Sequence, residues 1–321
     1  MSSGPPAILV RDLRKSYGEL EAVRGIDFEV APGEVFGLLG PNGAGKTTTV
    51  EILEGYRRRS GGIVSVLGFD PGERPRALRE RVGIVLQSCG MYRHVKVHEA
   101  VSYWAGMYPQ ARDVDEVIEI VGLTEKRDAL SRTLSGGQAR RLDLALALVH
   151  SPRILFLDEP TTGLDPQSRS ALWQEVGRLA KEEGVTVFLT TQYLEEADVL
   201  ADRVGIIDHG RIVAEGTPAA LKAEIGHPTL EVVPADPEQR PALSRILAGF
   251  GELTQLSPRS LAVRLRGDEF GLADVVRALD AEELHVEHLQ LHAPSLDDVF
   301  LAKTGRTLEG AGAEQEESLV P

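Results

Sequence analysis

One short segment constrains the fold of this chain more than any other. Gly40-Pro-Asn-Gly-Ala-Gly-Lys-Thr-Thr48 matches the pattern G-x-x-x-x-G-K-[ST] and directly follows the apolar stretch Val35–Leu39. Its glycines allow a turn whose backbone N–H groups point inward at the start of a helix, where a phosphate group is favoured. In such a loop Lys46 spans the β- and γ-phosphates of a nucleotide, and the Thr47 hydroxyl binds Mg²⁺. The segment therefore predicts nucleotide binding.

The plain alternative is a glycine-rich turn that contains Lys-Thr by chance. A chance match to the whole pattern is rare, and the strand before it makes that alternative weaker. The predicted nucleotide-binding residues of the loop are Gly40, Pro41, Asn42, Gly43, Ala44, Gly45, Lys46, Thr47 and Thr48.

Two adjacent acids follow another apolar stretch. Asp158 and Glu159 come directly after Ile154–Leu157. At the carboxyl end of a strand beside the phosphate loop, Asp158 can hold Mg²⁺, through water, and Glu159 can act as the general base that polarises the attacking water. An acidic loop at a strand end would be the better interpretation of Asp-Glu alone, but the phosphate loop upstream favours the functional one.

A second predicted anion site precedes these acids. Leu134-Ser-Gly-Gly-Gln138 opens a helix whose apolar residues, Leu142 and Leu146 among them, recur on one side. A serine at a helix N-terminus with two glycines exposes N–H groups to an anion. The pattern is weak alone, because serine caps beside glycine are common. Together with the phosphate loop it suggests that two elements serve different halves of a nucleotide site, and the residues concerned are Ser135, Gly136, Gly137 and Gln138.

Composition limits the partners of the chain. Its 321 residues carry a formal net charge of −14, which argues against nucleic acid as a main partner, since binding to phosphates needs surplus Lys and Arg. A single cysteine, Cys89, excludes an internal disulfide and a cysteine-clustered zinc site, and its spacing to His94 and His98 fits no standard zinc pattern. No apolar stretch is long enough to span a bilayer, and the first residues do not resemble a signal peptide. We expect a soluble, intracellular chain that reaches a membrane only through a partner.

The charge also indicates the domain organisation. Residues 1–228 carry −5, residues 229–305 carry −6 and residues 306–321 carry −3. The charge per residue thus rises where prolines cluster, and we expect a domain boundary at about 225–230. The predicted domains are 1–228, with a helical subdomain at about 88–152, and 229–305. The acidic segment 306–321, rich in Gly, Ala and Glu, is predicted to be disordered.

Alternating patterns predict an α/β fold for the first domain. Strands are expected at Ile8–Arg11, Asp27–Val30, Glu34–Leu39, Ile63–Val66, Arg81–Leu86, Ile154–Leu157, Val185–Leu189 and Val204–Ile207. Helical patterns cover Lys46–Glu54, much of Val97–His150, Pro166–Glu182 and Leu194–Ala201. Strands that alternate with helices imply a mostly parallel sheet, here with a helical insertion.

The second domain has a different order. Strand-like segments are Thr229–Val233, Glu252–Leu256, Ser260–Arg266 and Val286–His292, and helical ones are Arg240–Ala248 and Glu269–Leu279. This β-α-β-β-α-β order predicts a small ferredoxin-like α+β domain. A last helix is expected from Ser295, in Ser-Leu-Asp-Asp-Val-Phe300.

Together these segments resemble the ATP-binding subunit of an ABC transporter, over essentially residues 6–225. The resemblance implies a P-loop NTPase fold, with a RecA-like parallel sheet, an antiparallel β subdomain and a helical insertion. Gly40–Thr48 resembles the Walker A loop, Leu134–Gln138 the signature, and Leu157–Pro160 the Walker B strand with its catalytic glutamate.

Three single residues also match motifs of that family. By resemblance, Gln87 is the Q-loop glutamine that contacts Mg²⁺ and the nucleophilic water. Asp165, in Gly163-Leu-Asp165, lies in the D-loop, and Tyr17 is the aromatic residue that stacks on adenine. The cofactors implied are ATP and Mg²⁺. The implied assembly is a head-to-tail homodimer in which the signature of one copy faces the Walker A loop of the other.

One motif departs from the usual family pattern. Gln192, in Leu189-Thr-Thr-Gln-Tyr193, stands where the family usually has a histidine that contacts the γ-phosphate. An amide can donate a hydrogen bond but cannot carry a proton or a positive charge, so hydrolysis is expected to be slower, not absent. The same glutamine, and the Leu-Asp-Asp-Val-Phe300 segment, occur in the drug-exporter branch that includes the daunorubicin-resistance ATPases. In that branch the segment supports dimer or membrane-subunit contact, while the plain alternative is a capped helix that packs on its own domain.

The resemblance implies that the chain powers export of a hydrophobic small molecule, a drug or lipid-like compound, through a separate integral-membrane permease at the cytoplasmic face of a bacterial membrane. In this family Met91, Tyr92, Val97 and Trp104 would line a groove for the permease, although Trp104 fits a core position equally well. A soluble ATPase switch acting on ribosomes or DNA is one alternative. A regulatory clamp that barely hydrolyses ATP is another, motivated by Gln192 alone.

Overall fold

The chain forms two compact units in a computed structural model that describes residues 4–86, 94–254, 260–266 and 271–306. The first unit takes in Met1–Pro218 together with the segment that starts at Lys303, and the second is Ala219–Ala302. The second unit thus begins at the second residue of helix α8 (Pro218–Ile225), ahead of the boundary expected from charge. Beyond Arg306, the tail predicted to be disordered lies outside the described residues.

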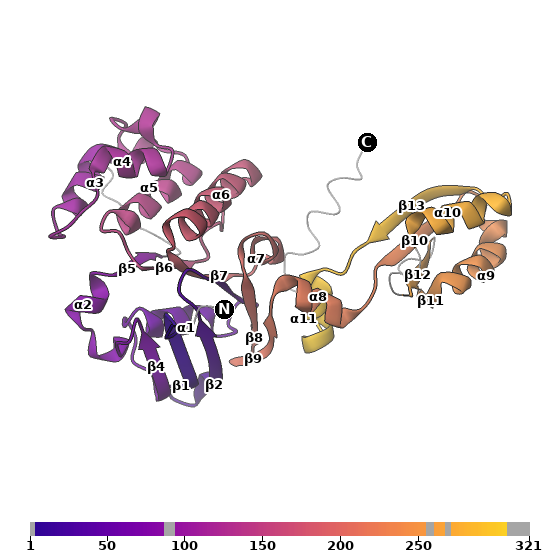
Figure 1. Cartoon of the computed structure of the whole chain (residues 1–321), viewed down its shortest axis with the longest axis horizontal. Helices are drawn as coiled ribbons and strands as arrows, with labels where there is room; N and C mark the ends of the chain where they lie inside the picture. The colour runs from indigo at the N-terminus through magenta and orange to yellow at the C-terminus, as the bar shows by residue number, and fades with distance from the viewer. Residues whose placement is uncertain (1–3, 87–93, 255–259, 267–270, 307–321) are drawn as a thin grey trace. The chain divides into compact units, whose positions relative to one another are not determined.

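A six-stranded sheet forms the centre of the first unit (Figure 1), in the order β5-β6-β7-β3-β8-β9. All neighbouring strands are parallel except β8 and β9 at one edge. Every residue of β3, β6 and β7 is buried, as parallel strands covered on both faces require. The strands are β3 (Val35–Leu39), β5 (Val82–Val85), β6 (Ile154–Asp158), β7 (Thr186–Thr191), β8 (Arg203–Asp208) and β9 (Arg211–Gly216).

The two faces of this sheet belong to different hydrophobic clusters, because side chains alternate along each strand. Leu155, Leu157 and Leu189 share one cluster with residues of the helical insertion and α6. Phe36, Phe156 and Phe188 share the other with α1 and a second sheet. The sheet therefore separates the helical insertion from an antiparallel β layer.

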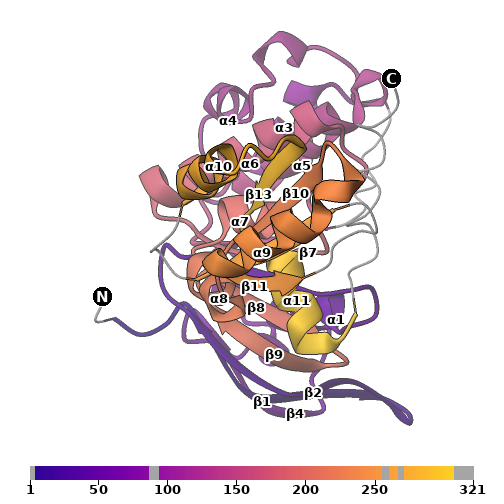
Figure 2. The ribbon, with the colours of Figure 1, turned by 90° about the vertical axis from the view of Figure 1, so that its right-hand side faces the viewer.

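That second sheet is three-stranded and antiparallel, in the order β2-β1-β4. Figures 1 and 2 show its strands side by side. Its strands are β1 (Ile8–Tyr17), β2 (Leu20–Val30) and β4 (Gly61–Val66). The first two are longer than the sequence predicted, since their outer halves alternate less clearly between apolar and polar residues.

The helices of the first unit connect these strands. The short elements are 3₁₀ turns and α2, and the longer ones are α5 and α6. Their bounds are α1 (Lys46–Leu53), η1 (Pro71–Glu73), α2 (Arg76–Arg79), α3 (Val97–Ala105), α4 (Val114–Ile120), η2 (Thr124–Lys126), η3 (Ser131–Thr133), α5 (Gly136–Leu148), α6 (Pro166–Glu183) and α7 (Leu194–Leu200).

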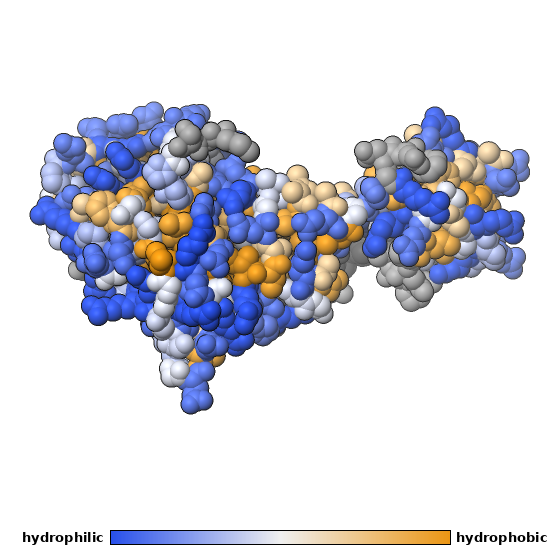
Figure 3. All heavy atoms as spheres, turned by 60° about the horizontal axis from the view of Figure 1, so that its bottom comes forward, coloured by the Kyte–Doolittle hydropathy of each residue, from blue (hydrophilic) through white to orange (hydrophobic). Residues whose placement is uncertain are grey.

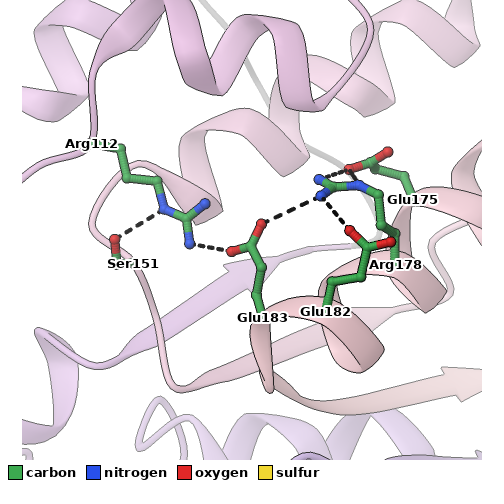
Figure 4. Close-up of polar contacts among 6 residues, drawn as sticks. All are labelled: Arg112, Ser151, Glu175, Arg178, Glu182 and Glu183. Atoms are coloured by element: carbon green, nitrogen blue, oxygen red, sulfur yellow. Dashed lines mark hydrogen bonds and ion pairs between the residues drawn. The ribbon is translucent and has the colours of Figure 1, made fainter.

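A charged cluster fixes the end of α6 (Figure 4). Arg112, in the segment before α4, donates to Ser151 Oγ at 3.0 Å and to the Glu183 carboxylate. Arg178, one turn earlier on α6, donates to Glu175 and lies 3.7 Å from Glu183 Oε1. The cluster ties the helical insertion to the C-terminal turn of α6.

The second unit has the predicted β-α-β-β-α-β order. Its sheet is antiparallel, in the order β11-β12-β10-β13, and one face packs on α9 and α10. The elements are β10 (Thr229–Pro234), η4 (Pro237–Gln239), α9 (Arg240–Phe250), β11 (Gly251–Thr254), β12 (Leu261–Leu265), α10 (Leu272–Ala281), β13 (Val286–His292) and α11 (Leu296–Thr304). The apolar residues of the Leu-Asp-Asp-Val-Phe300 segment are buried in α11, which favours packing within the chain.

Polar residues cover much of the face drawn in Figure 3, and apolar areas interrupt them. Among the described residues, none of the helices combines the length and the apolar character that a membrane crossing requires.

Candidate functional site

The phosphate loop leaves the carboxyl end of β3 and enters α1, as its sequence predicts. Gly45 has φ +109° and caps α1, and a Cβ there would lie 2.6 Å from the Ala22 carbonyl oxygen. A Cβ on Gly40 would lie 2.2 Å from the Ile207 carbonyl oxygen. Backbone atoms cannot yield as a flexible side chain can, so only glycine fits at either position.

Lys46 lies inside this loop and is only 3% exposed. Its ammonium group donates to the carbonyl oxygens of Gly40, at 2.7 Å, and Pro41, at 3.2 Å, and lies 3.3 Å from Glu159 Oε1. Burial lowers the pKa of Lys46, while the nearby Glu159 and Asp158 carboxylates oppose that change. A phosphate group, which is strongly anionic, would add to that support for the charged amine.

Asp158 closes β6 at the same edge of the sheet and is buried. Its Oδ1 accepts a hydrogen bond of 2.5 Å from Thr190 Oγ1, on the neighbouring strand β7. Burial raises the pKa of Asp158, whereas hydrogen bonds from Thr190 and Thr47 lower it. The Asp158 carboxylate and the Thr47 hydroxyl are in contact and are both hard oxygen donors, so these two residues fit Mg²⁺.

Glu159, the next residue, adopts a left-handed backbone conformation with φ +45°. Its N–H donates to Thr190, to the carbonyl oxygen and to Oγ1, each at 3.1 Å. The carboxylate accepts a longer hydrogen bond of 3.4 Å from Thr162 and faces Lys46. Left-handed backbone is uncommon for a residue with a side chain and concentrates at functional sites. The turn thus directs the carboxylate of Glu159 at the phosphate loop rather than along the strand.

Thr190 is a site residue that sequence reasoning missed, although the Thr-Thr pair at the end of β7 was a visible signal. Glu54, just after α1, is another. Burial raises the pKa of its carboxyl to about 8, and the Asp158 and Glu51 carboxylates add to the rise. Its Oε1 is buried without a hydrogen-bond partner. Nothing in the sequence distinguishes it from an ordinary glutamate at a helix end.

The predicted second anion site lies at the start of α5. Ser135 Oγ accepts from the N–H of Gln138 at 3.3 Å, and Gln138 Oε1 accepts from the N–H of Ser135 at 3.1 Å, which closes a capping box. A Cβ on Gly137 would lie 2.4 Å from Ser168 Oγ. Ser168 in turn donates to Asp165, the residue that caps α6, at 2.6 Å. The structure therefore brings Gly137 and Asp165 together through Ser168, with Ser135 and Gly136 exposed.

The remaining predicted residues are placed as follows. Gln192 is half-buried directly after β7, beside Thr191, whose carbonyl oxygen accepts from the N–H of Gly40 at 3.3 Å. Tyr17 ends β1 with its ring exposed, and the Lys15 ammonium lies 4.9 Å from the ring centroid. Gln87, with Cys89, Met91 and Tyr92, lies outside the described residues.

This arrangement fits transfer of a phosphoryl group to water. Lys46 supplies a positive charge inside the phosphate loop, Asp158 and Thr47 offer oxygen ligands suited to a cation, and the Glu159 carboxylate lies 3.3 Å from the Lys46 ammonium. Such reactions depend on positioning and on charge stabilisation more than on covalent chemistry.

Comparisons with known proteins agree with this chemistry. A sequence profile described as ABC transporter matches residues 23–162, and one described as ATP-binding protein DrrA1-3-like, C-terminal domain, matches residues 216–304. The chain is 40% identical to the daunorubicin resistance ATP-binding protein DrrA2 of Streptomyces coeruleorubidus, over 96% of this chain and 98% of that protein. It is 36% identical to the linearmycin resistance ATP-binding protein LnrL of Bacillus subtilis (strain 168), over 92% and 98%.

Solved structures give the same result for the fold. The chain matches cbiO1 from Clostridium perfringens, part of the ABC transporter complex cbiONQ, with a TM-score of 0.63 and 29% identity, over 69% of this chain and 92% of that one. It also matches the ATP-binding cassette MJ0796, solved as a dimer in a post-hydrolysis state with ADP and Pi. That match has a TM-score of 0.59 and 22% identity, over 65% of this chain and 98% of that one. The second likeness concerns the fold alone.

Proposed function

The chain belongs to the ABC transporter family of ATP-binding proteins and hydrolyses ATP, and from this premise we propose that it powers export of a hydrophobic small molecule through a separate membrane permease. The cargo class we propose is that of drugs and antibiotics, because the relatives are named for resistance to daunorubicin and linearmycin. Their likeness extends over nearly the whole length of both chains, including the C-terminal unit.

One observation carries the catalytic part of the proposal. Lys46, Asp158 and Glu159 come from two segments far apart in sequence, yet Lys46 Nζ lies 3.3 Å from Glu159 Oε1 inside the phosphate loop. Thr190 holds both acids, through Asp158 Oδ1 and the N–H of Glu159. The cluster has the cation, the metal ligand and the base that hydrolysis of a nucleoside triphosphate needs.

In the mechanism that follows, the N–H groups of the loop and Lys46 bind the β- and γ-phosphates and neutralise charge on them. Glu159 accepts a hydrogen bond from the attacking water and orients it toward the γ-phosphorus. Mg²⁺, held by Thr47 and Asp158, would stabilise the negative charge that develops on the phosphate oxygens. Gln192, beside the loop, donates an amide hydrogen bond where a histidine could also supply positive charge.

We further propose a head-to-tail homodimer. Ser135 and Gly136 are exposed at the positive end of α5, and the Ser135 side chain forms its hydrogen bond with Gln138 inside the cap. A helix N-terminus of this kind is suited to a phosphate brought by a second copy.

The permease contact that we propose involves α3. Tyr103 and Trp104 on this helix, and Met107 just after its end, are exposed, and exposed aromatic and methionine side chains are favoured at protein interfaces. Val97, which the sequence also offered as a groove residue, is fully buried in the core instead.

Glu159→Gln tests the assignment of the base. The substitution keeps the size of the side chain and removes its basicity, so kcat for ATP hydrolysis should fall by about 10²-fold or more, with ATP affinity retained. The measurement is phosphate release by the full chain, alone and co-purified with its permease in membranes. Unchanged turnover in the variant would contradict the assignment of Glu159 as the base. A wild-type rate that is the same with and without the permease would contradict the transport proposal.

A further inference from the structure

A buried arginine on α5 contacts the backbone at the end of β6 and in the turn that follows it. Arg140 is 7% exposed and lies on the helix that begins with the Ser135 cap. Its guanidinium donates to the carbonyl oxygens of Pro160, at 2.8 Å, of Asp158, at 3.1 Å, and of Glu159, at 3.4 Å. One side chain therefore contacts three consecutive residues across the turn that carries the base.

The same guanidinium contacts a second segment of the first unit. It donates to the carbonyl oxygen of Leu86, the residue that follows β5 and precedes Gln87. Asp143, one turn along α5, lies 3.9 Å from the guanidinium and balances its charge. Arginine suits this role because its planar fork presents five N–H donors in fixed directions, which lysine cannot do.

These contacts provide hydrogen-bond donors for the buried carbonyl groups of the turn. The strand ends at Asp158, and the left-handed conformation of Glu159 takes the following carbonyl groups away from the sheet. A buried carbonyl group without a partner costs about 1–3 kcal/mol. The arrangement thus links the stability of the turn, and with it the direction of the Glu159 carboxylate, to a side chain of α5.

We infer that Arg140 is a positioning residue for hydrolysis. Through its hydrogen bonds to the backbone of residues 158–160, it holds Glu159 in a fixed position relative to α5, the helix that begins with the Ser135 cap. The inference rests on the proposed ATPase site and deepens it. It predicts that Arg140 acts on turnover through Glu159 and leaves nucleotide binding, which depends on the phosphate loop, largely unchanged.

Arg140→Met and Arg140→Lys test this inference in the full chain. Methionine retains the bulk and removes every donor, so kcat should fall by about 10-fold or more while the Kd for ATP changes less than about 3-fold. Lysine restores the charge and part of the hydrogen bonding, so the kcat of Arg140→Lys should lie between that of Arg140→Met and that of the wild type. Arg141→Gln is the matched control, because the neighbouring Arg141 donates to the Gly122 carbonyl oxygen, away from the site.

A double-mutant cycle with Glu159→Gln separates positioning from a general structural role. If Arg140 acts through Glu159, Arg140→Met should cause little further loss of single-turnover rate once Glu159 is glutamine. An equal loss in both backgrounds would overturn the inference, and so would wild-type kcat in Arg140→Met. Should the methionine variant fail to fold, a folded Arg140→Lys with wild-type kcat overturns it as well. Failure of the proposed role of Glu159 as the base has a different signature, namely full activity of Glu159→Gln alone.

Discussion

At the scale of single residues, Glu54 is expected to make stability depend on pH. Its carboxyl has a pKa of about 8 in the folded chain, against an ordinary 4.5. Between these values the folded state retains a proton that the unfolded chain releases. The folded state then binds more protons, so its stability falls as pH rises through this range, by about 1.4 kcal/mol per pH unit at most.

Glu54→Gln removes this dependence. The variant should match the wild type near pH 4.5 and exceed it increasingly up to about pH 8, with a Tm difference there of about 4 °C or more. Thermal unfolding of both proteins across that range, without nucleotide or Mg²⁺, measures the difference. A constant offset at all pH values would contradict the prediction.

Gln192 stands where the family resemblance predicts a histidine, and Gln192→His tests what that difference does to hydrolysis. A histidine beside the phosphate loop can carry positive charge onto the γ-phosphate, so kcat should rise by about 3-fold or more. The gain should be largest below about pH 6.5, where histidine is protonated. ATPase rates from pH 5.5 to 8.5 test it, with Gln192→Ala as the control that should only lose activity. A histidine variant slower than wild type at every pH would contradict the expectation.

At the scale of elements, α5 and α6 meet at a point that admits no side chain. A Cβ on Gly137 would lie 2.4 Å from Ser168 Oγ and 2.6 Å from Ser168 Cβ. Gly137→Ala must therefore displace the first turn of α6, which Asp165 caps, and we expect a Tm lower by about 4 °C or more with reduced ATPase activity.

Gly177→Ala is the matched control for that prediction. Gly177 lies inside α6, and apart from the backbone of its own helix no described residue has an atom within 4 Å of a Cβ there; alanine is favoured over glycine in a helix interior by about 0.5–1 kcal/mol. This variant should melt at a higher temperature than the wild type and retain activity. Equal Tm values for the two variants would show that the contact at Gly137 is unimportant.

The sequence predicted those elements that have strong local signals. The phosphate loop, the buried strand before Asp158 and the order of the C-terminal unit were visible because composition changes sharply at their ends. β9 was missed, since Arg211–Gly216 is half-exposed and its apolar run is only Ile212-Val-Ala214. The outer part of β2, from Leu20, was missed for the same reason.

The candidate site was predictable where one segment supplies the chemistry and not where two segments meet. Lys46 and Glu159 follow from motifs, but their 3.3 Å contact does not. Thr190 and Arg140 act on residues 32 and 18 positions away in sequence, through hydrogen bonds that no local pattern records. An arginine among the buried residues of α5 was the one available signal for Arg140, since such a residue needs partners.

At the scale of the whole molecule, the chain returns to its first unit after completing the second. The segment from Lys303 belongs with Met1–Pro218, although Ala219–Ala302 intervenes. Arg306 in this segment pairs with Asp208, at the end of β8, and its guanidinium lies 3.2 Å from His209 Nε2. The turn after Asp208 also supports the phosphate loop, because the N–H of Gly210 donates to the Ala44 carbonyl oxygen at 2.9 Å.

Arg306→Ala should therefore destabilise the first unit. The Asp208 side chain is only 10% exposed, so removal of Arg306 leaves a largely buried carboxylate whose remaining ion-pair contact is His209 Nε2, 3.9 Å away, at a cost of about 1–3 kcal/mol. The expected result is a Tm lower by about 2–6 °C. Arg277→Ala is the control: that arginine pairs with Asp274 at an exposed position, where an ion pair contributes little.

Asp208→Asn in the Arg306→Ala background decides whether the unpaired charge is the cause. Asparagine has no charge to bury, so the double variant should recover most of the lost stability, and the two substitutions should be far from additive. Because the turn that follows Asp208 contacts the phosphate loop, Arg306→Ala should also weaken ATP binding, and the double variant should recover that affinity. A double variant as unstable as the sum of the two single ones would show that Arg306 stabilises the unit by packing rather than by its charge.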